Sequence, residues 1–420
     1  MATVVLGVTG GIAAYKAAEL LRLLKESGND VTVVPTQSAL RFVGEPTWAA
    51  LSGKPVATDV WTSTDTVPHV SLGQRADLVL IAPATADFLA RAAHGIASDL
   101  LTNVVLTARC PVVVAPAMHT EMWQHPATAA NVATLRERGV LVLEPAVGRL
   151  TGADSGPGRF PEPERVADFA HDVLRQRSRG RNPSQDLRGR SIVVSVGGTL
   201  EAWDDVRFLG NRSSGKQGFA LVRSAIARGA NVTAVVGSVA GPIPAGCSVV
   251  HVESAEDMRE SMHAYVAGKN PDVVVMAAAV ADFRPEGHAV GKITKEALEA
   301  KNQSVPELSL QRTTDILAEL VAKRGSQREP IIVGFAAETP GPGESLEARA
   351  LAKLQRKGCD YLVANAVNDG AVFGKDTTSV VIVAKDGRSV DCPGVDKLDA
   401  AHALWDMIVP GLTVPHSPSP

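Results

Sequence analysis

Short apolar runs that alternate with helical patterns constrain this chain more than any other feature. Residues 1–35 read as a strand, a Gly10-Gly11 turn, an Ala- and Leu-rich helix that ends near Gly28, and a second strand, DVTVVP. Similar apolar runs recur at 76–84, 111–118 and 139–146. Because these runs contain no alternating polar residues, they predict strands buried on both faces, as in a parallel sheet covered by helices.

The same pattern restarts in the second half of the chain. Apolar runs occur at 191–198, 271–279, 330–337, 360–367 and 379–387, again with helical patterns between them. A chain of 420 residues is also too long for one ordinary core. We therefore predict an α/β protein with two doubly wound, Rossmann-like domains.

An arginine-rich segment separates the two halves. Residues 175–190 hold six arginines and one aspartate without apolar periodicity, which indicates an exposed linker. A nucleic-acid patch is the alternative, and the absence of interleaved aromatic residues disfavours it. The expected division is a first domain at 1–174, the linker at 175–190, a second domain at 191–410 and a disordered tail at 411–420.

Composition and charge exclude several classes of protein. The formal net charge of −3 offers no general attraction to nucleic acid or to an anionic membrane. The four cysteines are widely spaced and form no C-x-x-C motif, which argues against a disulfide framework and a zinc site. No apolar run approaches 18 residues, and the N-terminus lacks a signal-peptide pattern. We expect a cytoplasmic protein that acts on small molecules.

Residues 210–217, GNRSSGKQ, match the glycine and lysine spacing of a P-loop. However, Gln217 replaces the hydroxyl that holds Mg²⁺, and thirteen residues separate Val196, in the preceding apolar run, from Gly210. The stretch instead favours a local anion site at a helix start, with a solvated helix cap as the alternative. The candidate anion ligands are Arg207, Asn211, Arg212, Ser213, Ser214, Gly215 and Lys216.

The first glycine turn, GVTGGIAAYK, lacks the third glycine of a dinucleotide-binding fingerprint. A strand-to-helix turn of this kind can present backbone N–H groups to a single phosphate, which suits a mononucleotide such as FMN. A tight turn without a ligand is the alternative reading of this motif.

Longer motifs resemble two enzyme families. GVTGGIAAYKAAELLR, PHVSLGQRADLVLIAPATADFLARAA, VVAPAMHTEMW and GADSGPGR are similar to motifs of the flavin-dependent phosphopantothenoylcysteine decarboxylases. VRFLGNRSSGKQGFA, MAAAVADFRP, KITK, VGFAAET and KLQRKGCDYLVANAV resemble the phosphopantothenate–cysteine ligases. Their order over residues 2–410 resembles the bifunctional bacterial proteins of coenzyme A biosynthesis.

This resemblance implies two linked reactions. The second domain would use CTP and Mg²⁺ to activate 4′-phosphopantothenate as an acyl-cytidylate, which L-cysteine converts to an amide. The first domain, with a flavodoxin-like fold, would use FMN to oxidise the cysteinyl thiol, so that the carboxylate leaves, and then to return the hydride. Two alternatives stay open: a decarboxylase for another cysteinyl substrate with an impaired ligase half, and a regulatory flavoprotein without catalysis.

In the first domain, the resemblance assigns roles to three groups of residues. His69 and His119 are the expected catalytic residues, and His119 takes a position where many relatives carry an asparagine. The substrate would contact Met118, Asp154, Gly158 and Arg159, and Gly152 lies where many relatives have a flap cysteine. FMN would contact Gly10, Gly11, Ile12, Thr36, Ser38, Ala84, Thr85 and Asp87.

In the second domain, the expected catalytic residues are Arg207, Asn211 and Lys292, with Asn211 stabilising the acyl-cytidylate and Lys292 offsetting phosphate charge. Asp282 would hold Mg²⁺. The substrate would contact Ser213, Ser214, Gly215 and Lys216, and the nucleotide would contact Asp282, Lys292, Phe335, Lys353, Lys357 and Asn365.

The chain departs from the ligase pattern upstream of this site. Leu200, Ala202 and Asp205 occupy positions where relatives commonly carry an arginine and two prolines, and Thr294 interrupts the usual lysine run in KITK. Loss of a cation and of two stiffening prolines predicts a less efficient ligase or an altered substrate. The family also implies homo-oligomers, with trimers of the flavin domain and dimers of the ligase domain that together build a dodecamer.

Overall fold

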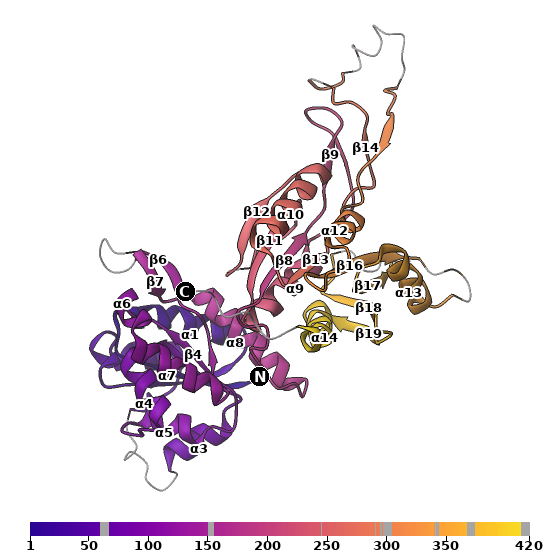
Figure 1. Cartoon of the computed structure of the whole chain (residues 1–420). Coiled ribbons are helices and arrows are strands. Elements are labelled where there is room, and N and C mark those ends of the chain that lie inside the picture. The colour runs from indigo at the N-terminus through magenta and orange to yellow at the C-terminus, as the bar shows by residue number, and fades with distance from the viewer. Residues whose placement is uncertain are drawn as a thin grey trace. The chain divides into compact units, whose positions relative to one another are not determined.

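The computed structural model describes the chain except for residues 59–66, 150–154, 245, 290, 295, 297–304, 340, 342–343, 368–373 and 413–420. It divides into two compact units, Met1–Gln185 (unit 1) and Asp186–Pro420 (unit 2) (Figure 1). Of the residues named above, Gly152 and Asp154 lie outside the described part. None of the described helices is both long enough and apolar enough to span a membrane.

In the described part of unit 1, five strands form a parallel sheet. Their order is β2-β1-β3-β4-β5, which is the flavodoxin-like order and confirms the predicted fold class. Val4 of β1 lies opposite Val31 on one side and Leu78 on the other. The strands are β1 (Thr3–Val8), β2 (Asp30–Pro35), β3 (Leu78–Ala84), β4 (Val112–Pro116) and β5 (Leu141–Val142).

Amphipathic helices pack on this sheet. In α1 the buried residues Ala17, Leu20, Leu21 and Leu24 recur at helical spacing and form one apolar stripe. The helices of unit 1 are η1 (Ile12–Tyr15), α1 (Lys16–Glu26), η2 (Ala39–Arg41), α2 (Glu45–Ser52), α3 (Pro68–Arg75), α4 (Ala86–His94), α5 (Leu100–Thr107), α6 (Thr120–Gln124), α7 (Pro126–Glu137) and α8 (Pro163–Ser178). A separate antiparallel ribbon pairs β6 (Ala146–Arg149) with β7 (Ser155–Arg159).

Unit 2 is built on an eight-stranded sheet, as far as the structure describes it. Its order is β12-β11-β8-β13-β16-β17-β18-β19, where the first six strands are parallel, β18 is antiparallel to β17, and β19 is antiparallel to β18. Counted along the chain, the six parallel strands follow the Rossmann order 3-2-1-4-5-6. The strands are β8 (Ser191–Val196), β11 (Asn231–Val236), β12 (Ser248–His251), β13 (Val273–Met276), β16 (Ile331–Glu338), β17 (Tyr361–Ala366), β18 (Thr377–Ala384) and β19 (Ser389–Asp396).

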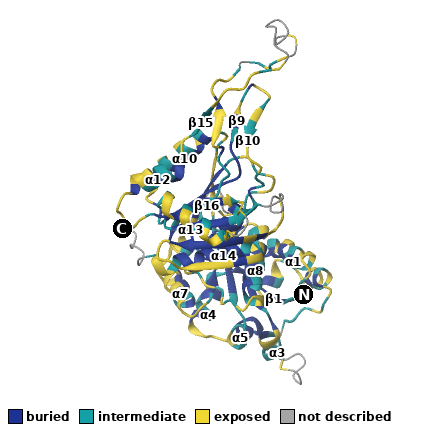
Figure 2. Ribbon diagram, turned by 90° about the vertical axis from the view of Figure 1, so that its right-hand side faces the viewer, coloured by how far each residue is buried: buried dark blue, intermediate teal, exposed yellow. Residues whose placement is uncertain are grey.

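Successive residues of the central strands of unit 2 enter two separate cores. Val194 and Val275 pack with Trp405 in one core, whereas Val193 and Val274 pack in the other. This alternation is the geometry of a strand covered on both faces, and Figure 2 shows these strands as buried. The helices are α9 (Lys216–Ala227), α10 (Ala255–Lys269), α12 (Ile316–Arg324), α13 (Leu346–Lys357), α14 (Lys397–Ile408) and η4 (Val409–Gly411).

Two antiparallel ribbons extend beyond this sheet (Figure 1). One pairs β9 (Leu200–Ala202) with β10 (Phe208–Gly210), and the other pairs β14 (Phe283–Pro285) with β15 (Leu310–Arg312). A parallel bridge between Asp204 and Ala289 joins the two ribbons. We call these ribbons, with residues 203–207, 286–289 and 291–294, the arm.

The boundary between the units differs from the expected linker at 175–190. Helix α8 continues to Ser178, and unit 2 already begins at Asp186. Leu187 is fully buried in the core of unit 2, and Arg190 is buried as well. The burial of Leu187 and Arg190 could not be predicted from the arginine-rich sequence, because one leucine among polar residues produces no apolar periodicity.

Candidate active sites

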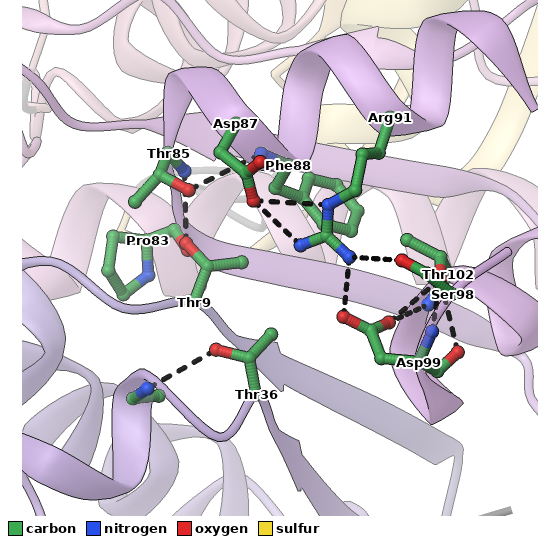
Figure 3. Close-up of polar contacts among 11 residues, drawn as sticks. Thr9, Thr36, Pro83, Thr85, Asp87, Phe88, Arg91, Ser98, Asp99 and Thr102 are labelled. Carbon is green, nitrogen blue, oxygen red and sulfur yellow. Dashed lines mark hydrogen bonds and ion pairs between the residues drawn. The ribbon is translucent and has the colours of Figure 1, made fainter. Parts of the chain in front are cut away.

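The turns that follow β1 and β3 are joined at the carboxyl edge of the sheet in unit 1 (Figure 3). The Thr9 hydroxyl donates to the carbonyl of Pro83 over 2.7 Å and accepts from the backbone N–H of Thr85 over 2.9 Å. Thr85 also caps α4 by accepting from the N–H of Phe88. The strand order reverses between β1 and β3, and ligands of open parallel sheets bind at such a point.

The turn after β2 meets the same edge. The backbone N–H of Thr36 donates to the carbonyl of Val8 over 2.9 Å. A Cβ atom on Gly10 would lie 2.2 Å from the Cβ of Ser38, so only glycine allows these two turns to approach so closely. The structure thus brings together Gly10, Thr36, Ser38 and Thr85, as the sequence analysis expected.

Asp87 lies on the first turn of α4, beside this edge, and it pairs with a neighbour on its own helix (Figure 3). Its side chain is 74% exposed and lies 2.8 Å from Nη2 of Arg91. Arg91 also binds Asp99 over 2.6 Å, and Asp99 caps α5. Burial raises the pKa of Asp99, but bonds from Arg91 and Thr102 outweigh burial and hold it below its usual range.

The β6–β7 ribbon contacts the loop after β4. The N–H of Met118 donates to the carbonyl of Gly158 over 2.9 Å, and a Cβ on Gly158 would lie 2.3 Å from the carbonyl oxygen of Met118. Arg159 follows directly and binds Glu162 over 2.5 Å, while Lys16 binds the other oxygen of that carboxylate over 3.0 Å. Two cations therefore converge on one carboxylate near the expected substrate loop.

The two expected catalytic histidines lie on different helices of unit 1. His69 is the second residue of α3, which packs on α5, and its carbonyl accepts from the Thr107 hydroxyl over 2.8 Å. Its Nδ1 is buried without a hydrogen-bond partner among the described residues. His119 caps α6 at the N-terminus, next to β7. Helices α3 and α6 are well separated in Figure 1.

Unit 2 contains a cavity of about 560 Å³ at the carboxyl ends of its parallel strands. The order of strands reverses between β8 and β13, and the cavity lies at this reversal. The Asn211 side chain donates to the carbonyl of Val280 over 2.9 Å, and both residues line the cavity. The expected site residues that line it are Asn211, Ser213, Ser214, Gly215, Lys216, Asp282, Phe335, Lys353, Lys357 and Asn365.

Each expected lysine of this cavity is paired with a carboxylate. Lys216 binds Asp376 over 2.7 Å. Lys353 binds Glu338 over 2.6 Å, and Lys357 binds Asp315. An anionic ligand would therefore compete with carboxylates for these three amines.

Lys397 also lines the cavity and was missed by the sequence analysis. It is buried, and it donates to the carbonyl of Lys375. Burial and the nearby charge of Lys216 lower the pKa of Lys397. No local motif marks this residue, because the antiparallel strands β18 and β19 carry the chain back to the cavity before α14 begins at Lys397.

Arg207 and Lys292 lie on the arm and do not line the cavity. Arg207 directly precedes β10 and Asn211 directly follows it, so the three-residue strand separates the two by roughly 13 Å of extended chain. Its Nη2 donates to the carbonyl of Ile293 over 2.7 Å, which brings Arg207 beside the Lys292 segment. Leu200 and Ala202 lie in β9, opposite Gly210 and Phe208.

Asp204 organises the turn between β9 and β10. Its carboxylate is buried and accepts from the N–H groups of Val206, Arg207 and Ile293, and from the Arg207 guanidinium. Burial raises the pKa of Asp204, but these hydrogen bonds outweigh burial and hold it well below its usual range.

The fold and these sites define a two-domain α/β protein whose first domain is a flavoprotein. The family model described as "Flavoprotein" matches residues 1–175, and the model described as "DNA/pantothenate metabolism flavoprotein C-terminal domain" matches residues 187–412. The chain belongs to the family of coenzyme A biosynthesis bifunctional proteins, CoaBC. It is 53% identical to the Mycobacterium tuberculosis protein of that name, over 97% of this chain and 96% of that protein. Identity to the Bacillus subtilis protein is 40%, over 96% of each chain.

Solved structures resemble each unit separately. The C-terminal domain of a CoaBC protein is 35% identical, covers 53% of this chain and 96% of its own, and has a TM-score of 0.42. A PPC decarboxylase mutant complexed with pantothenoylaminoethenethiol is 31% identical, covers 40% of this chain and 96% of its own, and has a TM-score of 0.39. By its family, the chain is an enzyme of coenzyme A biosynthesis with decarboxylase and ligase activities.

Proposed function

We propose that unit 2 joins 4′-phosphopantothenate to L-cysteine through an acyl-cytidylate formed from CTP, and that unit 1 decarboxylates the product with FMN. The observation that carries this proposal is the cavity of unit 2, where Asn211, four lysines and Asp282 surround one space at the strand reversal. Family membership supplies the pairing of a decarboxylase with a ligase.

In this proposal the lysines of the cavity bind phosphate groups. Without a ligand, Lys353 pairs with Glu338 and Lys357 pairs with Asp315. Both lysines would exchange these carboxylates for phosphate groups of the nucleotide. Phe335 supplies an aromatic surface to the cytosine ring. Asn211 and the start of α9 would stabilise the acyl phosphate, because backbone N–H groups at a helix start favour an anion.

Asp282 suits Mg²⁺ only together with the nucleotide. Among the residues that the structure describes, no group of three or more His, Cys, Asp or Glu side chains could hold a metal ion. Mg²⁺ commonly keeps several waters and is bound by one or two carboxylates with substrate phosphates. Asp282 would then provide the carboxylate ligand, and the triphosphate and water would provide the other ligands of Mg²⁺.

The carboxyl edge of unit 1 fits a flavin phosphate. The Thr36 and Thr85 hydroxyls accept from the N–H groups of Ala39 and Phe88, so their own O–H groups can donate to a phosphate beside Gly10. When bound, the flavin would accept a hydride from the cysteinyl thiol carbon and later return it. His69 would move a proton near the departing carboxylate, and His119 would donate a hydrogen bond to that carboxylate. Arg159 and Lys16 would orient the substrate's anionic groups.

Separation of His69 from His119 supports a homo-oligomer in which one protomer's His69 completes a neighbour's flavin site. Exposed apolar side chains next to the first turn favour this arrangement: Ile12 is 59% exposed and Tyr15 is 61% exposed. We propose trimers of unit 1 and dimers of unit 2, which together give a dodecamer. Gel filtration with light scattering would contradict this assembly if the protein eluted as a monomer.

The ligase proposal is tested with purified protein, 4′-phosphopantothenate, L-cysteine, CTP and Mg²⁺. Asn211→Ala should lower pyrophosphate release about 100-fold or more, because it removes a donor to the activated phosphate. Asn231→Ala, an exposed amide at the start of β11, is the matched control and should leave the rate unchanged. Absence of CTP-dependent pyrophosphate release from the unaltered protein would reject the ligase assignment.

The decarboxylase proposal is tested with pre-formed 4′-phosphopantothenoylcysteine. The purified protein should be yellow with flavin absorbance. His69→Asn should lower decarboxylation roughly 100-fold, whereas His94→Asn, in the last turn of α4, should not change it. Normal turnover by His69→Asn would remove His69 from the mechanism.

A further inference from the structure

The segment that carries Lys292 is held by the turn between β9 and β10. On the N-terminal side of Lys292, the Asp205 carboxylate accepts from the N–H of Gly291 through Oδ2 over 2.9 Å. Its other oxygen lies 2.9 Å from Nε2 of His288. Both contacts of this side chain therefore reach the Lys292 segment.

The other side of Lys292 is held by the neighbours of Asp205. Ile293 donates its N–H to Asp204 over 3.1 Å, and its carbonyl accepts from Arg207 over 2.7 Å. The Arg207 guanidinium carbon lies 4.8 Å from the ring centre of Trp203, which further restricts that arginine. The backbone on both sides of Lys292 is thus fixed to one turn.

Lys292 itself is exposed and makes no hydrogen bond or ion pair in the described part of the chain. The turn that holds its backbone continues through β10 directly into Asn211. The turn between β9 and β10 therefore fixes the backbone position of Lys292, and the strand that follows this turn leads to Asn211 in the cavity.

Asp204 and Asp205 hold this arrangement in different ways. Most bonds of Asp204 close its own turn, through the N–H groups of Val206 and Arg207 and the Arg207 guanidinium. Loss of Asp204 would therefore disrupt the turn itself. Asp205 is half exposed, with 53% of its side chain accessible, and within the described residues it contacts Gly291 and His288. Loss of Asp205 would release only the Lys292 segment.

We propose that Asp205 is a positioning residue for the ligase, which holds the main chain before Lys292 so that its amine can reach the reacting phosphate. This inference rests on the proposed role of Lys292 in the activation step. The absence of a proline at position 205 led to the expectation of a less efficient ligase. The inference is the opposite, because a proline side chain could not accept hydrogen bonds from Gly291 or His288. A proline here would stiffen the turn between β9 and β10. The aspartate instead forms hydrogen bonds that connect this turn to the Lys292 segment.

The kinetic test compares Asp205→Ala, Asp205→Asn and Lys292→Gln in the full-length protein. Asp205→Ala should lower kcat for CTP-dependent pyrophosphate release about 10- to 100-fold, because small displacements of a charged group weaken catalysis by such factors. The KM for CTP should change less than threefold, since the cavity does not contain Asp205. Asp205→Asn keeps an acceptor oxygen for Gly291 and should recover most of the lost rate.

Glu286→Ala is the matched control, because Glu286 is an exposed arm carboxylate without a side-chain partner among the described contacts. Its rate should equal that of the unaltered protein. Decarboxylation of pre-formed 4′-phosphopantothenoylcysteine should be unchanged in every variant, because that activity belongs to unit 1 and the substitutions lie in unit 2. In the Lys292→Gln background, Asp205→Ala should add less than a twofold further loss, because Asp205 acts through Lys292.

Trypsin cleavage after Lys292, followed by mass spectrometry, gives a readout that is independent of catalysis. Release of Gly291 should make Asp205→Ala several times more sensitive at this bond than the unaltered protein or Glu286→Ala. An unchanged cleavage rate together with full activity of Asp205→Ala would overturn the inference. Independent, multiplicative losses in the double variant would also overturn it. Full activity of Lys292→Gln would instead reject the proposed role of Lys292.

Discussion

A single buried guanidinium holds both ends of unit 2. Arg228 is 5% exposed and binds Asp186 through two nitrogens, over 2.7 and 2.6 Å. Its third nitrogen binds Asp406 over 2.7 Å. Burial lowers the pKa of Arg228, but Asp186 and Asp406 outweigh this effect and hold it above its ordinary value. The arginine is therefore charged at every accessible pH.

Arg228→Ala should destabilise unit 2 by about 2–3 kcal/mol, because it removes charge-assisted bonds and leaves two partly exposed carboxylates. For a domain of this size, the melting temperature should fall by roughly 4–12 °C. Differential scanning calorimetry would measure the shift, with Arg223→Ala, an exposed arginine on α9, as the control. A shift equal to that of the control would show that Arg228 contributes nothing measurable.

Asp99→Asn should reduce the stability of unit 1 by about 1 kcal/mol at neutral pH, allowing for solvent screening of the Arg91 pair. The asparagine oxygen still caps α5, so the loss isolates the charge. Because the folded-state pKa of Asp99 is lowered, its contribution is complete above the ordinary value of 3.8 and is lost as pH falls through the folded-state value. Urea unfolding at several pH values should therefore give a difference that shrinks only below about 3.8.

At the scale of elements, α9 depends on close packing at its start. A Cβ on Gly218 would lie 2.8 Å from Cγ1 of Val196 in β8. The missing side chain lets the helix start approach the strand end, next to the ligase cavity. This is the structural reason for a glycine in the stretch GKQG, where the sequence alone indicates only a helix start.

Gly218→Val should destabilise unit 2 by about 1–3 kcal/mol through overpacking and should also lower ligase activity by displacing the start of α9. Gly268→Ala, in α10, is the control and should have the opposite effect. A Cβ at Gly268 would have no atom within 4 Å, so alanine should stabilise the helix by roughly 0.5–1 kcal/mol. Urea unfolding would measure both changes. Retention of full stability in Gly218→Val would contradict the packing argument.

The elements also show which parts of the fold were predictable. The buried parallel strands were predicted because an unbroken apolar run fits few other structures, and β8, β13 and β17 fall within the predicted runs. The arm strands β9, β10, β14 and β15 were missed, since a strand of three residues is too short to show a period. The cavity residues were predicted by motif, whereas Lys397 reaches the site through long-range antiparallel pairing.

At the scale of the whole molecule, the two units should be separable. A chain of residues 186–420 retains Asp186 and Leu187 and should unfold in one cooperative transition. A chain of residues 191–420 lacks both and should melt at least several degrees lower, because it loses a fully buried leucine and the partner of Arg228. Calorimetry of the two chains tests this, and equal melting temperatures would refute it.

The shared guanidinium has a topological consequence. Asp186 stands at the beginning of unit 2 and Asp406 lies in α14, so the start of this unit and its helix α14 meet at one guanidinium. A short peptide could join those two points, and the ring so formed could be opened at the exposed residues 326–328. The fold of unit 2 is then a property of its packed layers and does not depend on where the polypeptide begins.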